Sequence, residues 1–171
     1  MIAPGPDSAQ LGQILAAAAR TPDHGKLGPW RFVVVGADHR VALADLLHSA
    51  LSAEKPDAPQ AEHDAMDQFA HQAPSLVVVL SAPVTTSPVP LWEQQLSAGA
   101  ACMNLLAATH ALGFTGCWLT GWAAYSDRVR AALGGPEGSR IAGFLFLGTP
   151  GKPLEERPRP DLADVVSHWA P

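Results

Sequence analysis

The longest apolar stretch of this 171-residue chain, residues 96–112, constrains its fold more than any other segment. It belongs to a predicted helix at 91–112 that begins as an amphipathic helix and then becomes apolar nearly all round, a pattern typical of a helix buried on every side. It is too short and too polar to cross a bilayer, because four polar residues interrupt it: Ser97, Asn104, Thr109 and His110. One chain of this size has few residues with which to pack around every side of such a helix. We therefore expect a tightly packed homodimer, with this helix as the hub of a monomeric core as the alternative.

Short segments rich in β-branched and aromatic residues alternate with helical patterns along the chain. Those bounded by Gly, Pro or Ser predict strands at 31–36, 75–81, 114–119 and 140–148. We expect the first strand to be buried on both faces at its centre. Strands separated by helices predict a three-layer α+β or α/β sandwich.

The helices are predicted from their apolar spacing and from residues that cap helix ends. Ser8 is expected to cap a helix that Pro22 ends, Asp38 a second helix, and Ser126 a short one, with Gly113 as a left-handed cap after residues 91–112. Further helices are expected at 61–71 and 162–169. We treat residues 1–171 as one domain, with an extended N-terminus at 1–7 and a proline-rich C-terminal arm at 149–171.

Composition excludes several classes of function. With 47% hydrophobic and 16% charged residues, the chain can bury an ordinary core. The net charge is −5 and the 11 Lys and Arg are scattered, which argues against nucleic acid or an anionic membrane as a partner. No secretory signal is visible, so we expect a cytoplasmic protein, in which Cys102 and Cys117 are reduced and buried.

Most standard catalytic motifs are missing from the sequence. It contains no G-x-G-x-x-G after a strand, no phosphate-binding P-loop, no H-E-x-x-H and no G-x-S-x-G. Four residues could be drawn as metal ligands: His63, Asp64, Asp67 and His71. Their spacing does not bring the two histidines onto adjacent turns, so we interpret them as a solvated helix face and predict no metal site.

The loop between residues 20 and 32 is the most informative stretch. Arg20, His24 and Trp30 place cationic and donor groups in a loop rich in Pro and Gly that leads into a strand, where they could hold an anionic, planar ligand. A structural interpretation stays open beside this one. In it, Arg20 complements the dipole at the C-terminus of the first helix, His24 is an exposed loop residue and Trp30 belongs to the core.

Four segments together resemble the small members of the FMN-dependent nitroreductase family. They are Arg-Thr-Pro-Asp-His with Pro-Trp-Arg-Phe at 20–32, Pro-Leu-Trp-Glu-Gln-Gln-Leu-Ser-Ala-Gly at 90–99, Gly-Cys-Trp-Leu-Thr-Gly at 116–121 and Gly-Phe-Leu-Phe-Leu-Gly-Thr-Pro at 143–150. The resemblance implies an α+β homodimer with a mostly antiparallel central sheet and FMN in a cleft between subunits. It also implies electron transfer from NADH or NADPH through the flavin to a nitro compound, quinone or similar small acceptor.

The same resemblance implies the residues that bind the cofactors. Arg20 and His24 match residues that hold the ribityl-phosphate end of FMN. Three residues match the segment that borders the flavin, namely Trp118, Leu119 and Thr120, although close relatives carry an arginine where this chain has Leu119. A further stretch matches residues that some members associate with the nicotinamide cofactor: Ala108, Thr109, His110, Ala111, Leu112 and Gly113. Because the flavin carries the electrons, no catalytic acid or base is assigned.

The N-terminal segment departs from the family pattern. Members carry an Arg-x-Ser element that binds the FMN phosphate, and residues 1–7 contain no such element. Three explanations are open: the natural protein starts further upstream, FMN binding is weakened or lost, or another basic residue substitutes, with Lys26, Lys152, Arg157 and Arg159 as candidates. The alternative function is therefore a flavin-poor or flavin-free dimeric binding protein on the same scaffold.

Overall fold

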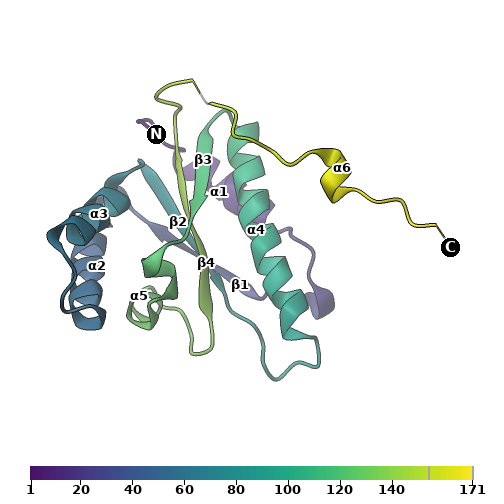
Figure 1. Cartoon of the computed structure of the whole chain (residues 1–171), viewed down its shortest axis with the longest axis horizontal. Coiled ribbons are helices and arrows are strands. Elements are labelled where there is room, and N and C mark those ends of the chain that lie inside the picture. Colours follow the sequence, from purple (N-terminus) through teal and green to yellow (C-terminus); the bar gives the residue numbers. More distant parts are fainter. Residues whose placement is uncertain (154, 171) are drawn as a thin grey trace.

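A four-stranded antiparallel sheet lies at the centre of the computed structural model, which describes residues 1–153 and 155–170 (Figure 1). The strand order is β1-β2-β4-β3. The strands are β1 (Trp30–Val35), β2 (Ser75–Ser81), β3 (Thr115–Leu119) and β4 (Arg140–Gly148). The structure thus confirms the strands predicted at 75–81 and 140–148, and shifts the ends of the other two by one residue.

The inner strands are apolar on both faces and therefore require a helical layer on each side. Along β2, Leu76 and Val78 point into one hydrophobic cluster, whereas Val77 and Val79 point into the other. The helices are α1 (Ser8–Ala18), α2 (Arg40–Glu54), α3 (Gln60–His71), α4 (Leu91–Ala111), α5 (Asp127–Ala132) and α6 (Leu162–Val165). Residues of α1 and α4 pack on the Val77 side, and residues of α2, α3 and α5 on the opposite side. This arrangement confirms an α+β three-layer sandwich.

Two of the predicted helix caps are wrong. Helix α1 is capped by Asp7, whose carboxylate accepts a hydrogen bond from the Gln10 backbone N–H at 2.8 Å, and not by Ser8. Asp38 lies in a short 3-10 turn (Ala37–His39) and makes no capping bond to α2. At α1 the chain offers two polar residues in succession, and the backbone path selects the one that caps, whereas α2 begins without a side-chain cap.

Two other caps are confirmed. Gly113 has a φ of 82°, and the next residue, Phe114, donates its backbone N–H to the Thr109 carbonyl at 3.2 Å. This bond closes the end of α4 as a Schellman motif does. Ser126 caps α5, because its hydroxyl oxygen accepts the Val129 N–H at 3.2 Å.

The expected burial of the first strand is wrong. Strand β1 lies at an edge of the sheet, and its residues Arg31 and Val34 are exposed. A β-branched run identifies a strand, but it does not specify the place of that strand in the sheet order.

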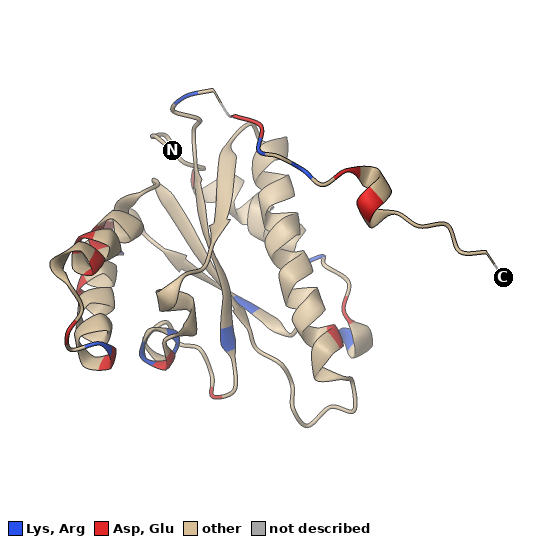
Figure 2. Ribbon diagram, in the orientation of Figure 1, with Lys and Arg blue, Asp and Glu red and all other residues tan. Residues whose placement is uncertain are grey.

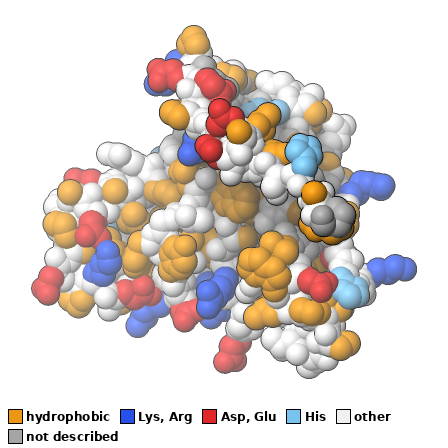
Figure 3. Space-filling model, turned by 45° about the vertical axis from the view of Figure 1, so that its right-hand side comes forward, with side chains coloured by type: hydrophobic (Ala, Val, Ile, Leu, Met, Phe, Trp, Pro, Cys, Tyr) orange, Lys and Arg blue, Asp and Glu red, His pale blue; other side chains and the backbone are white. Residues whose placement is uncertain are grey.

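Helix α4 is not buried on every side in one chain, which disagrees with the alternative that it is the hub of a monomeric core. Its inner face is fully buried, and Leu105 is 0% exposed there. Its outer face is not covered: Trp92, Leu96 and Met103 are 67%, 53% and 54% exposed. The space-filling view, which turns the α4 side forward, shows hydrophobic side chains gathered there below the C-terminal arm (Figure 3). The helix is therefore a two-faced element with one face left open.

The C-terminal arm leaves the body of the molecule (Figure 1). All described residues of 155–170 are exposed, and the arm contains only the short helix α6 instead of the helix predicted at 162–169. At the other end of the chain, Ile2 pairs with Thr149 through backbone bonds of 3.0 and 2.9 Å. Basic and acidic residues are dispersed over the surface (Figure 2). Among the described residues, no helix has the length and apolar character needed to span a membrane.

The two cysteines are free thiols, as predicted. Cys102 is fully buried in α4, and burial raises its pKa to about 12. Cys117 in β3 is half-buried, and burial raises its pKa as well. Neither thiol is set up as a nucleophile, because the reactive form is the thiolate.

Trp118 of β3 lies flat on β4 because a glycine faces it. Its indole N–H donates to the Ala142 carbonyl at 2.9 Å, and a side chain at Gly143 would overlap the indole ring. On the other side of the ring, Gly99 of α4 leaves room for its edge. Two glycines thus fix the position of this tryptophan between sheet and helix.

We predict that Gly143→Ala lowers the free energy of unfolding by about 1–3 kcal/mol, because the added methyl group overpacks the indole. The matched control is Gly12→Ala in α1, where nothing lies within 4 Å of the new methyl group. The control should raise stability by up to about 1 kcal/mol through helix propensity. Urea unfolding of both variants measures the difference. Equal stability of the two variants would contradict this packing.

Candidate functional site

One end of the sheet lies beside both groups of predicted flavin-binding residues. We call it the site end: β1 and β4 begin there, and β2 and β3 finish there. The register defines it, because Trp30 pairs with Ser81 and Ser81 pairs with Arg140. The loop at 20–29 enters the sheet at this end, and the segment Trp118–Thr120 leaves it.

The loop before β1 is tied to α4 by buried hydrogen bonds. The Ser97 hydroxyl donates to the Pro22 carbonyl at 2.9 Å and accepts the Trp30 indole N–H at 3.2 Å. Further along α4, Asn104 donates its amide N–H to the hydroxyl of the buried Thr21 at 2.7 Å. These contacts fix the backbone on both sides of residue 23. Trp30 is therefore part of the core, in agreement with the structural interpretation of this residue.

His24 and Glu93 form a close pair beside a cavity. The His24 Nδ1 and Glu93 Oε2 atoms lie 2.7 Å apart, with side chains 63% and 45% exposed. The cavity measures about 430 Å³ and is lined by Pro22, Asp23, His24, Glu93, Leu96, Ser97 and Ala100. Because Glu93 occupies Nδ1, the Nε2 atom of His24 is the ring nitrogen left for a ligand. Sequence reasoning did not assign Glu93 a role, although it lies within one of the family-like segments.

Arg20 lies at the same loop, two residues beyond the end of α1. Its side chain is exposed and forms no hydrogen bond or ion pair with any residue the structure describes. In particular, it does not hydrogen-bond to the last carbonyls of α1. Such bonds would be expected if Arg20 only complemented the helix terminus. Its five N–H donors are thus available to an anion.

The side chains of Trp118 and Leu119 lie on opposite sides of the sheet. Trp118 lies on the α4 side of the sheet, whereas the Leu119 side chain packs against the opposite cluster. Leu119 stands where relatives carry an arginine. In this chain that position therefore makes an apolar contact with the layer of α2, α3 and α5. Thr120 is exposed at the site end.

The two groups of predicted flavin-binding residues lie at opposite edges of the sheet. The loop carrying Arg20 and His24 leads into β1, and Trp118–Thr120 belongs to β3, the other edge strand. Three strand spacings separate these edges, about 14 Å. The cavity beside His24 includes none of residues 118–120. One chain therefore presents two half-sites at one end of its sheet.

The segment predicted for the nicotinamide cofactor lies far from the site end. His110 is 17 residues along α4 from Glu93, about 26 Å at 1.5 Å per residue. Thr109 is fully buried and donates its hydroxyl to the Leu105 carbonyl at 2.8 Å, and Ala108 packs against the core. The exposed members of this segment are His110, Ala111, Leu112 and Gly113.

The loop after β2 is held in place at the site end by a buried glutamine. Gln94 is 3% exposed, and its amide accepts the Val84 N–H at 2.8 Å and donates to the Val89 carbonyl at 3.0 Å. Composition alone predicts a loop for this segment. The hydrogen bonds of Gln94 give that loop a defined path beside the start of α4.

The candidate metal ligands on α3 do not converge. His63 Nδ1 lies 3.0 Å from His48 Nδ1, whereas His71 bonds to the Asp67 carbonyl at 2.9 Å. In the part of the chain that the structure describes, no group of three or more His, Cys, Asp and Glu side chains is placed to hold a metal ion.

Comparison with known proteins agrees with the resemblance seen in the sequence. The model of the Nitroreductase family matches residues 3–149. The chain is 37% identical over 147 residues to the Escherichia coli (strain K12) protein named "Putative NAD(P)H nitroreductase YdjA", covering 86% of this chain and 79% of that relative.

Two solved structures share the fold. A nitroreductase-like family protein from Bacillus cereus superposes with a TM-score of 0.83 at 19% identity, over 97% of this chain and 87% of that one. A nitroreductase with bound FMN from Bacteroides fragilis gives a TM-score of 0.67 at 24% identity, over 92% and 86% of the two chains. The sequence match covers most of the chain, and this protein belongs to the nitroreductase family.

Proposed function

We propose that this protein is an FMN-dependent oxidoreductase that takes electrons from NADH or NADPH and passes them to a nitro compound, quinone or similar small acceptor. The observation that carries the proposal is the pair of half-sites at the site end, with an unengaged Arg20 and a His24 oriented by Glu93. The name of the Escherichia coli relative and the FMN bound in the Bacteroides fragilis structure support it.

The donor set at the loop fits the phosphate end of FMN. A phosphate needs cationic or N–H donors, and Arg20 offers a guanidinium with no competing partner among the described residues. The nearby carboxylates are already engaged: Asp23 accepts the Gly28 N–H at 2.9 Å, and Glu93 pairs with His24. Both acids therefore already have a hydrogen-bond partner within this chain.

The isoalloxazine ring, when bound, accepts a hydride and returns electrons to the acceptor. The residues of this chain position and shield it. Trp118 supplies a flat wall that two glycines hold in place, and Thr120 supplies exposed polar groups at the end of β3. Arg20 and His24 anchor the opposite end of the cofactor. The assignment of residues 108–113 to the nicotinamide stays a prediction from the resemblance.

We further propose that the active form is a homodimer, with the flavin in a cleft between subunits. The open face of α4 carries Trp92, Leu96 and Met103 at helical spacing, a larger apolar surface than monomers usually leave exposed. Two copies related across this face would bring a half-site of one chain next to the other half-site of its partner. We also propose that residues 1–171 are one domain of a cytoplasmic protein, with the arm at 149–171 outside the sandwich.

We predict that Arg20→Ala weakens FMN binding about tenfold to a hundredfold, because a charge-assisted hydrogen bond contributes about 1.5–3 kcal/mol. Arg128→Ala, which removes an exposed arginine from α5, serves as the control and should leave FMN binding unchanged. Fluorescence titration with FMN measures the dissociation constants, and thermal unfolding checks the fold. A lowered melting temperature with unaltered FMN affinity would assign Arg20 to the helix end instead.

We also predict that wild-type protein is dimeric at micromolar concentration and that Met103→Glu makes it a folded monomer. Met103 is chosen because it is exposed, whereas a charge at Leu105, which is buried within its own chain, would disrupt the fold itself. Val41→Glu on α2 is the matched control, since Val41 is 66% exposed but lies outside the α4 face. Sedimentation velocity distinguishes the variants. A monomeric wild type, or a dimeric Met103→Glu, would overturn the interface.

A further inference from the structure

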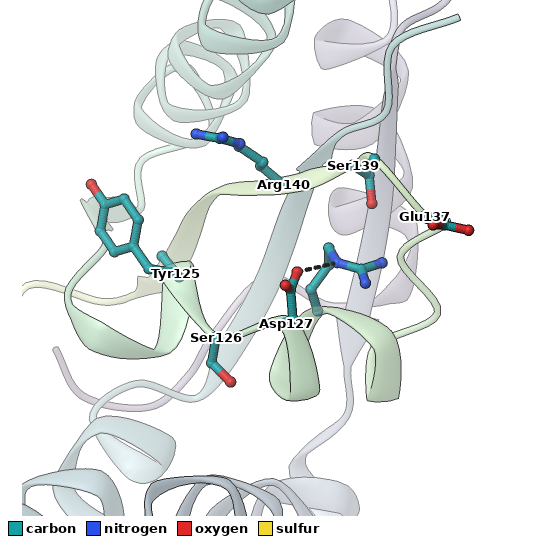
Figure 4. A pocket seen from close by; sticks show the side chains of 9 residues that line it. Tyr125, Ser126, Asp127, Glu137, Ser139 and Arg140 are labelled. Carbon is teal, nitrogen blue, oxygen red and sulfur yellow. Dashed lines mark hydrogen bonds and ion pairs between the residues drawn. The ribbon is translucent and has the colours of Figure 1, made fainter. Parts of the chain in front are cut away.

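A second cavity opens at the site end, next to the end of β3. It measures about 540 Å³ and lies between the turn after β3, the start of α5 and the turn that leads into β4 (Figure 4). Its lining is mainly polar or charged: Ala124, Tyr125, Ser126, Asp127, Arg130, Glu137, Gly138, Ser139 and Arg140. No residue predicted from the sequence to bind a cofactor lines it.

Two guanidinium groups line this cavity, and they are used differently. Arg130 is a structural residue: its Nε donates to Asp127 at 3.1 Å, and its Nη1 donates to the Gly135 and Pro136 carbonyls. Arg140 is exposed and has no hydrogen bond or ion pair with any described residue. The Asp127 carboxylate is taken up by Arg130, and Figure 4 shows Glu137 directed away from Arg140. The local positive charge of Arg140 is therefore unneutralised.

Arg140 is the first residue of β4, the strand that pairs with the proposed flavin segment further along its length. Ile141 packs in the cluster of α2, α3 and α5, whereas its neighbour Ala142 packs on the α4 side. Arg140 pairs with Ser81, which continues the Val77 and Val79 side of β2, so Arg140 also lies on the α4 side of the sheet. The Ala142 carbonyl is the one that accepts the Trp118 indole N–H at 2.9 Å. Arg140 thus lies two residues before the residue that positions Trp118, with a register shift of β4 between them.

Tyr125 adds an aromatic wall next to this cation. Its side chain is 79% exposed, and in Figure 4 it extends from the turn after β3 on the same side of the cavity as Arg140. An aromatic ring beside a free guanidinium suits a planar ligand that carries an anionic group, because the ring contributes apolar contact and the guanidinium a bidentate bond.

We propose that Arg140 determines acceptor specificity by binding the carboxylate of a planar aromatic acceptor whose reducible group lies at Trp118–Thr120. This inference rests on the proposed function and names the substrate class of that site. The net charge of −5 strengthens the argument, since the overall field repels anions and an acidic substrate then depends on a local cation.

The test compares two acceptors that differ in one charge, 4-nitrobenzoate and 4-nitrobenzamide, on flavin-loaded protein. Arg140→Gln should raise the KM for 4-nitrobenzoate about fivefold and leave that for 4-nitrobenzamide unchanged, because only the carboxylate loses its partner. Arg128→Gln removes the same charge from an exposed position outside the cavity and should change neither. Calorimetric titration with benzoate, which is not reduced, gives a readout independent of turnover and should show the same loss of affinity.

Three results would overturn this role. Equal effects of Arg140→Gln on both acceptors would assign Arg140 to the fold, and a changed KM for NADH or NADPH alone would assign it to the electron donor. Loss of FMN from the variant, with unaltered selectivity, would assign it to the cofactor phosphate. These outcomes leave the proposed function standing. A wild-type protein that binds no flavin would instead contradict the proposed function, and the role of Arg140 with it.

Discussion

Burial of the two inner strands on both faces is the constraint on which the rest of this structure depends. Every residue from Leu76 to Leu80 of β2 is at most 1% exposed, and Phe144 to Leu147 of β4 are 0% exposed. Burying each such side chain stabilises the fold by about 1.5–3 kcal/mol, so a helical layer on each face is required. Helix α4 covers one face with its inner side. Its length and apolar outer side then create a surface that a single chain leaves open.

The same packing builds the site end. Ser97 joins the loop before β1 to α4 and to Trp30, while Gly99 and Gly143 leave the space that Trp118 occupies. Core packing therefore fixes the backbone beside both half-sites, although Arg20, His24 and Thr120 themselves are exposed. A preorganised frame with exposed polar ends suits a protein that holds a cofactor and leaves the chemistry to it. It also separates the buried core of α4 and the sheet from the exposed residues to which ligand binding is proposed.

The sequence predicted the elements well, because periodicity and β-branched content reflect local backbone preference. The strands at 75–81 and 140–148 and the caps at Gly113 and Ser126 belong to this class. Sheet order is a non-local property, so the edge position of β1 was missed. The same reason applies to the site. The resemblance pointed to Arg20 and His24, but only three-dimensional contact brings Glu93 to His24 and ties Trp118 to the Ala142 carbonyl of β4.

The visible absorption spectrum of the purified protein after FMN reconstitution and desalting tests the central claim most directly. The account predicts flavin bands at about one FMN per chain, bleached when NADH or NADPH is added without oxygen and restored by an acceptor. A desalted protein that is folded and dimeric but shows no flavin bands would contradict the account. It would identify the chain as a binding protein on the nitroreductase scaffold.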